Sequence, residues 1–198
     1  MRSYTIAPVC APIDWDAIAP LPIDIPHWGT ETDIQAQARL CYDENALHIK
    51  MEAVEANIRA EEEGPLANPC RDSCLEFFFS PMEGDGRYFN IEFSPTGAMY
   101  LGFGDTGYGL VRLIQDDKIF SPAITRTGSG WEIIYSVPFA FIRHFFPAFD
   151  PQTGKAIRAN FYKCGDRTAN KHYLTWNPIT GPKKSFHLPE FFAPVYFG

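Results

Sequence analysis

The stretch RDSCLEFFFSPMEGDGRYFNIEFSPTG, residues 71–97, decides the fold because it contains two segments of alternating polarity. Apolar side chains occupy every second position over 73–80 and again over 87–94. This period of two is typical of β-strands with one face in a core. Turn-forming residues follow each segment, at 83–86 and at 95–97. We therefore expect two successive strands, the second of which leads into a hairpin.

The same alternation extends over most of the chain and predicts an all-β domain. Further strands are expected at 34–42, 47–54, 98–103, 110–114, 119–125, 131–137 and 157–164, before Trp176, and at the end of the chain. Short strands with frequent turn signals indicate an antiparallel β-sandwich of the immunoglobulin or jelly-roll kind. At most one or two short helices are expected, with 138–146 as the candidate. Residues 1–198 are predicted to form a single domain, with 1–30 as an irregular N-terminal segment.

The composition excludes several classes of partner. The chain has 198 residues and a formal net charge of −7, with no basic cluster. Such a charge argues against binding to nucleic acid or to an anionic membrane surface, whereas neutral sugars need no steering field. No apolar run resembles a signal peptide or is long enough to span a bilayer. We expect a soluble protein, either cytoplasmic or exported with its signal removed.

The five cysteines do not form a recognisable metal motif. Cys70 and Cys74 are separated by three residues, and no second pair or nearby histidine completes a tetrahedral set. We expect reduced, partly buried thiols, with room for one disulfide, and neither a cofactor nor a metal site. Structural calcium stays open because acidic residues lie in loops, although no twelve-residue calcium loop is present. These acidic residues are Asp43, Glu44, Asp85, Asp105, Asp116 and Asp117.

Polar side chains recur on the non-core side of three predicted strands. If these strands share a sheet, its outer face carries two carboxylates, two amides, an arginine and two tyrosines. Amides and carboxylates hydrogen-bond vicinal hydroxyls, and tyrosine adds a stacking surface. Antiparallel sheets also carry polar faces without any function. The residues concerned are Glu76, Tyr88, Asn90, Glu92, Arg158, Asn160 and Tyr162.

The four tryptophans divide into packing and binding candidates. Trp131 leads a predicted core strand, and Trp15 is expected to cover an edge of the core. Trp176 stands on a loop beside Asn177, where an indole could stack on the apolar face of a pyranose. Trp28, between His27 and Gly29, fits either role.

Four segments together resemble the family 9 carbohydrate-binding modules. They are 71–79, 88–97, 130–139 and the closing phrase from Trp176 to Phe192, so the resemblance covers nearly the whole chain. It implies an antiparallel β-sandwich without catalytic activity that often holds sugar ends between two tryptophan rings, in some members with structural calcium. Asn68-Pro69-Cys70 carries no aromatic residue where these modules have one. A second ring would then come from Trp28 or Tyr88.

The predicted function is non-catalytic carbohydrate binding by aromatic stacking and polar contacts. One alternative is a glycoside hydrolase that uses Glu76 and Glu92 as its carboxylate pair. Others are a haem-binding sandwich, although no C-x-x-C-H motif is present, and an interaction domain that keeps the fold without binding sugar. The predicted ligand-binding residues are Trp176, Asn177, Arg71, Glu76, Tyr88, Asn90, Glu92, Asn160, Tyr162 and Trp28.

Overall fold

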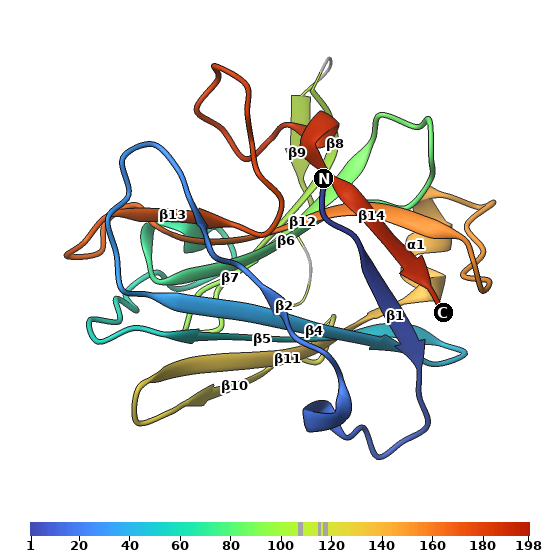
Figure 1. Ribbon diagram of the computed structural model, residues 1–198, viewed down its shortest axis with the longest axis horizontal. Helices are drawn as coiled ribbons and strands as arrows, with labels where there is room; N and C mark the ends of the chain where they lie inside the picture. Colours follow the sequence, from blue (N-terminus) through green and yellow to red (C-terminus); the bar gives the residue numbers. More distant parts are fainter. Residues whose placement is uncertain (107–108, 115, 117–118) are drawn as a thin grey trace.

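The computed structural model describes residues 1–106, 109–114, 116 and 119–198, and these form two layers of β-sheet (Figure 1). The strands of the first sheet, in spatial order, are β14 (Ala193–Phe197), β12 (Ala156–Gly165), β6 (Cys74–Ser80), β7 (Tyr88–Phe93), β8 (Met99–Asp105) and β9 (Gly109–Arg112). Those of the second are β10 (Ala123–Arg126), β11 (Gly130–Pro138), β5 (Ala46–Val54) and β4 (Gln35–Tyr42). Each of these strands coincides with a segment predicted from alternation.

The N-terminal strand β1 (Tyr4–Pro8) joins the two sheets and corrects the antiparallel prediction. It pairs in parallel with β14, where Ile6 faces Phe197, and in parallel with β4, where Ala7 faces Cys41. Parallel neighbours are not connected by tight turns, so no hairpin signal in the sequence marks this pairing. The segment 1–30 also contains η1 (Trp15–Ala17), β2 (Leu21–Pro22) and β3 (Ile25–Pro26). It is therefore more regular than expected.

The remaining elements are short. β13 (His172–Thr175) extends the first sheet beside β12, and η2 (Pro69–Arg71) and η3 (Pro189–Phe191) are single 3-10 turns. The α-helix α1 (Phe139–Phe145) lies within the predicted helical segment. Phe139, Ile142 and Phe146 recur at the spacing of one helix face, and all three are buried in the core. None of the described helices is long and apolar enough to cross a membrane.

The main core fills the space between the sheets. Phe77 of β6 stacks on Phe79 and on Phe161 of β12, in each case with ring centroids 4.7 Å apart. A second apolar cluster lies on the outer face of the first sheet and includes Phe78, Tyr162 and Phe186. The segment 176–192, here the C-terminal loop, contributes residues to this second cluster. The face predicted to be polar and open is therefore largely covered.

Candidate functional site

A pocket of about 520 Å³ lies on the outer face of the first sheet, beside the C-terminal loop. Its floor comes from β6, β7 and β12, and its walls from the turn before β4, from β13 and from the loop. Its size falls in the range of roughly 300–1,000 Å³ that is common for small-ligand sites. The lining residues are Trp28, Gly29, Thr30, Cys70, Glu76, Glu92, Cys164, Asp166, Lys171, Tyr173, Lys184, Ser185, Phe186 and His187.

The floor consists of two carboxyl groups and a thiol. Glu76 and Glu92 are direct cross-strand partners on β6 and β7, and their residues are only 3% and 7% exposed. Cys164 Sγ donates to Glu76 Oε1 at 2.8 Å, and Asn90 Nδ2 donates to Glu92 Oε1 at 3.0 Å. The alternation predicted for these strands does place both carboxyl groups on one face. Their burial shows that the face is the bottom of a pocket, not an open surface.

Burial changes the ionisation of both floor carboxyl groups. It raises the pKa of Glu76 well above its ordinary range, and the neighbouring Glu92 raises it further. Burial also raises the pKa of Glu92 to about 7, against the lowering effect of the hydrogen bond from Asn90. A protonated carboxyl group can donate as well as accept a hydrogen bond. The raised pKa values favour the protonated forms, which can donate hydrogen bonds to a ligand as well as accept them.

Three aromatic rings form one wall. The half-buried Trp28 lies 5.0 Å from Tyr173 and 5.1 Å from Phe186, measured between ring centroids. Phe186 in turn stacks on Tyr162 at 4.2 Å, which fixes it against the sheet. The wall thus combines a packed base with an indole that keeps part of its surface exposed.

The backbone at Trp28 is unusual and is held by β13. Trp28 and Gly29 both have positive φ, 57° and 83°, and Thr30 N–H donates to the His27 carbonyl at 3.0 Å to close the turn. The main chain of Tyr173 accepts from His27 N–H at 3.0 Å and donates to Thr30 Oγ1 at 2.9 Å. Bulky residues rarely adopt positive φ, and such positions are often functional. This turn places the indole at the pocket.

The rim of the pocket carries charged side chains of both signs. Asp166, Lys171 and Lys184 are exposed lining residues from different segments. Tyr173 Oη donates to Asp166 Oδ1 at 2.6 Å, and Lys171 Nζ lies 5.5 Å from the centre of the Tyr173 ring. Because both signs are present at the mouth, this rim does not select strongly for a charged ligand.

The prediction that Trp176 forms an open stacking platform is wrong. Trp176 is 2% exposed and belongs to the main core. Its ring packs edge-on against Phe161, with ring centroids 5.8 Å apart. The main-chain N–H of Trp176 also donates to the Phe161 carbonyl at 2.9 Å. The period of two along β13 explains this position, because Leu174 and Trp176 both point between the sheets.

Two predicted amides are engaged in holding the chain together. Asn160 Oδ1 accepts from Asn177 N–H at 2.9 Å, and Asn160 Nδ2 donates to the Asn177 carbonyl at 3.0 Å. The Asn177 side chain binds the main chain of Arg2 and of Phe191. Both residues are buried and neither lines the pocket, so the structure gives them a structural role, and their ligand-binding role stays a prediction.

The two predicted tyrosines and Asn90 are buried as well, whereas Arg71 stays partly exposed. Tyr88 Oη lies 3.1 Å from His187 Nδ1, and Tyr162 Oη donates to the Phe186 carbonyl at 3.2 Å. Asn90 supports Glu92 from beneath and does not line the pocket. Arg71 lies outside the lining, with its guanidinium 3.5 Å from Glu62 Oε1. The pocket thus unites only Trp28, Glu76 and Glu92 from the predicted set.

Asp43 and Asp85, two of the loop carboxylates considered for calcium, have protein partners. Asp43 Oδ1 accepts from the main-chain N–H groups of Asn45 and Ala46. Asp85 forms an ion pair with Arg87 at 2.6 Å. Asp117 lies outside the described residues. Calcium binding at these loops stays a prediction.

The sequence alone did not identify most of the residues that form the pocket walls. Tyr173 precedes core-facing Leu174, and this alternation indicates that Tyr173 faces outward. The sequence does not show that its strand pairs with β12 beside the pocket. Phe186 and His187 stand in a loop without periodicity, so their place over the sheet depends on tertiary contacts. Cys164 is separated from Cys74 by 90 positions and reaches the floor only through the pairing of β12 with β6.

A two-layered β-sandwich with an aromatic wall and a polar floor belongs to the class of small-ligand-binding β domains. Residues 11–197 match the family model of carbohydrate-binding family 9, and the chain belongs to that family. The predicted class of function, carbohydrate binding, is thereby confirmed.

Solved structures agree with this fold. A "putative carbohydrate-binding protein" of Bacteroides uniformis superimposes with a TM-score of 0.87 at 26% identity, covering 100% of this chain and 99% of that one. A family 9 module of Caldicellulosiruptor kristjanssonii in complex with glucose gives a TM-score of 0.67 at 13% identity, with coverage of 100% and 96%. A family 9 module of the same organism in complex with cellotriose gives a TM-score of 0.66 at 13% identity, with coverage of 99% and 93%. No curated protein sequence matches.

Proposed function

We propose that the pocket walled by Trp28, Tyr173 and Phe186 is where this chain binds carbohydrate. The observation that carries the proposal is the meeting of a partly exposed indole with two buried carboxyl groups in one cavity. The apolar face of a pyranose packs on an indole, while its hydroxyl groups exchange hydrogen bonds with carboxyl groups. The glucose and cellotriose held by the module from Caldicellulosiruptor kristjanssonii are therefore suitable first probes.

The test is a titration of the protein with glucose and cellotriose, followed by calorimetry and by amide chemical shifts. We expect Trp28→Ala to weaken binding about tenfold, because loss of an aromatic stacking contact costs on the order of 1 kcal/mol. Trp15→Ala is the control, since Trp15 is also half-buried but lies outside the pocket. Trp176→Phe should bind as the wild type does. Full binding by Trp28→Ala would place the site elsewhere.

We further propose that the pocket is not catalytic. Glycosidases place one protonated and one ionised carboxyl group on either side of the scissile bond. Here Glu76 and Glu92 lie side by side on the floor, and burial raises the pKa of both. We expect no hydrolysis of aryl glycosides by the wild-type protein. Turnover that disappears in Glu76→Gln would support the hydrolase alternative instead.

A further inference from the structure

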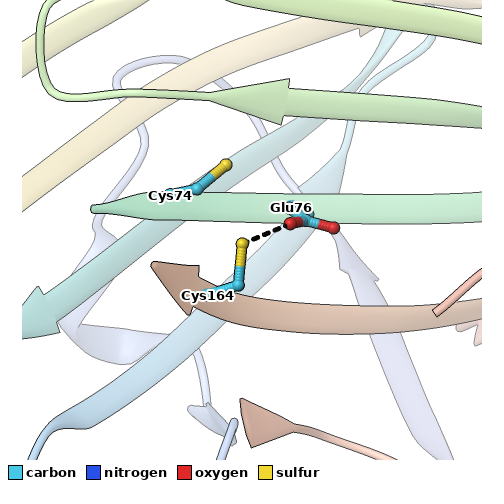
Figure 2. A group of neighbouring side chains, drawn as sticks. All are labelled: Cys74, Glu76 and Cys164. Carbon is cyan, nitrogen blue, oxygen red and sulfur yellow. Dashed lines mark hydrogen bonds between the residues drawn. The ribbon is translucent and has the colours of Figure 1, made fainter. Parts of the chain in front are cut away.

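Two thiols and a carboxyl group meet beside the pocket floor (Figure 2). Cys74 of β6 and Cys164 of β12 are directly opposite each other, and Glu76 follows Cys74 by two positions on the same face of β6. One ligand atom from each residue lies within 4.8 Å of the others, and all three residues are buried. Antiparallel pairing thus brings together groups that the sequence keeps 90 residues apart.

The chemistry of this set suits a thiophilic divalent cation. Zinc is bound by cysteine sulfur at about 2.3 Å and by carboxylate oxygen at about 2.0–2.2 Å, so ligands around one ion lie roughly 3.5–4 Å apart. The observed spread of up to 4.8 Å requires only small side-chain movements to reach this arrangement. Calcium and magnesium prefer all-oxygen sites and do not match two sulfur ligands.

The carboxyl groups of the floor have no ion-pair partner among the described residues. Among the ion pairs of the described residues, none includes Glu76 or Glu92, although both side chains are buried. Burial favours the neutral form of such a carboxyl group, and a bound divalent ion would supply the positive partner that favours its ionised, coordinating form. The hydrogen bond from Cys164 to Glu76 is the contact that the ion would replace.

The pocket supplies a route for entry. Glu76 and Cys164 line it, whereas Cys74 lies behind them outside the lining. An ion held by the three residues would therefore have its fourth position directed to the pocket and filled by water, as in open zinc sites. We propose that Cys74, Cys164 and Glu76 form a zinc site at the floor of the pocket. This site does not depend on whether the pocket holds sugar.

Reduced protein, freed of metal by dialysis against a chelator, provides the test. We expect it to bind one equivalent of Zn²⁺ in competition with a chromogenic chelator. With Co²⁺ as the probe, we expect a sulfur-to-cobalt charge-transfer band and the visible absorption of a tetrahedral site. Absence of that band from the folded wild-type protein overturns the proposal without recourse to any variant.

Variants then locate the site. Cys164→Ser should weaken zinc binding by more than about 100-fold, since loss of an outer-sphere partner alone costs about 10–100-fold. Glu76→Gln should weaken it while leaving the charge-transfer band in place. Cys41→Ser is the matched control, because Cys41 is equally buried but lies on β4 of the other sheet. Zinc binding that survives both Cys74→Ser and Cys164→Ser would disprove the assignment.

Discussion

At the scale of single residues, Trp28 combines two features that rarely occur together. Its indole forms part of a ligand pocket, and its backbone adopts a φ of 57°. A side chain with a Cβ is strained in that conformation by about 1–2 kcal/mol relative to glycine. Hydrogen bonds to Tyr173 on both sides of the turn hold the chain in this conformation.

This strain can be measured by comparing two substitutions of Trp28. Trp28→Ala and Trp28→Gly both remove the indole, but only glycine relieves the backbone. We expect Trp28→Gly to have a free energy of unfolding about 1 kcal/mol higher than Trp28→Ala, as determined by chemical denaturation. Equal stability of the two variants would show that the turn stores no strain.

At the scale of elements, the alternation along β12 turns one charged side chain into the core. Tyr162 and Cys164 point to the pocket side, whereas Phe161 and Lys163 point between the sheets. Lys163 Nζ lies 2.8 Å from Nε2 of His172, the residue that begins β13. The opposing Gly165 leaves room for this ring, because a Cβ there would lie 2.6 Å from His172 Cε1.

The buried imidazole makes stability depend on pH. Burial first, and then the nearby Lys163 charge, lower the pKa of His172 to about 4, from about 6.5 in an unfolded chain. Between these values the unfolded chain binds a proton that the folded protein does not. The stability that the protein has with a neutral His172 is fully present above pH 6.5. As the pH falls from 6.5 towards 4, protonation of the unfolded chain lowers the free energy of unfolding by up to roughly 3 kcal/mol.

The measurement is the free energy of unfolding at several pH values for wild type and for His172→Gln. We expect the difference between the two proteins to change over this interval, with the wild type losing more stability as the solution becomes acidic. Parallel curves from pH 6.5 to pH 4 would contradict the assignment.

At the scale of the whole molecule, one polar cluster ties the two sheets together inside the core. Glu55, directly after β5, accepts from Trp131 Nε1 of β11 at 3.0 Å and from Ser73 Oγ at 2.9 Å. Lys163 of β12 completes the cluster with an ion pair of 3.2 Å to Glu55, and both side chains are essentially inaccessible. The cluster therefore links β5 and β11 of one sheet with β12 of the other.

Removal of the cation from this cluster should be severely destabilising. Lys163→Met leaves the Glu55 carboxylate buried without its charge partner, which typically costs about 3–5 kcal/mol. Lys155→Met breaks an exposed pair with Asp150 and should cost at most about 1 kcal/mol. Both values are measured by denaturant unfolding. A loss below about 1 kcal/mol in Lys163→Met would mean that the pair contributes little.

Alternation predicted most of the strands and correctly placed Glu76 and Glu92 on one face, because a half-buried strand has a strict period of two. It could not predict that the C-terminal loop covers much of that face, nor that Trp176 turns inward. The parallel pairing of β1 and the meeting of Cys74 with Cys164 depend on topology, which local pattern does not encode. Three of the predicted binding residues, Trp28, Glu76 and Glu92, therefore line the pocket, while the others lie outside its lining.

The place of β14 has a consequence for biosynthesis. Residues 193–197 lie between β1 and β12 in the strand order, so they form the seam through which the two sheets are continuous. A nascent chain halted before Ala193 would contain all the other strands that the structure describes and yet lack that seam. We therefore expect the two sheets to become continuous only after residues 193–197 have left the exit tunnel of the ribosome.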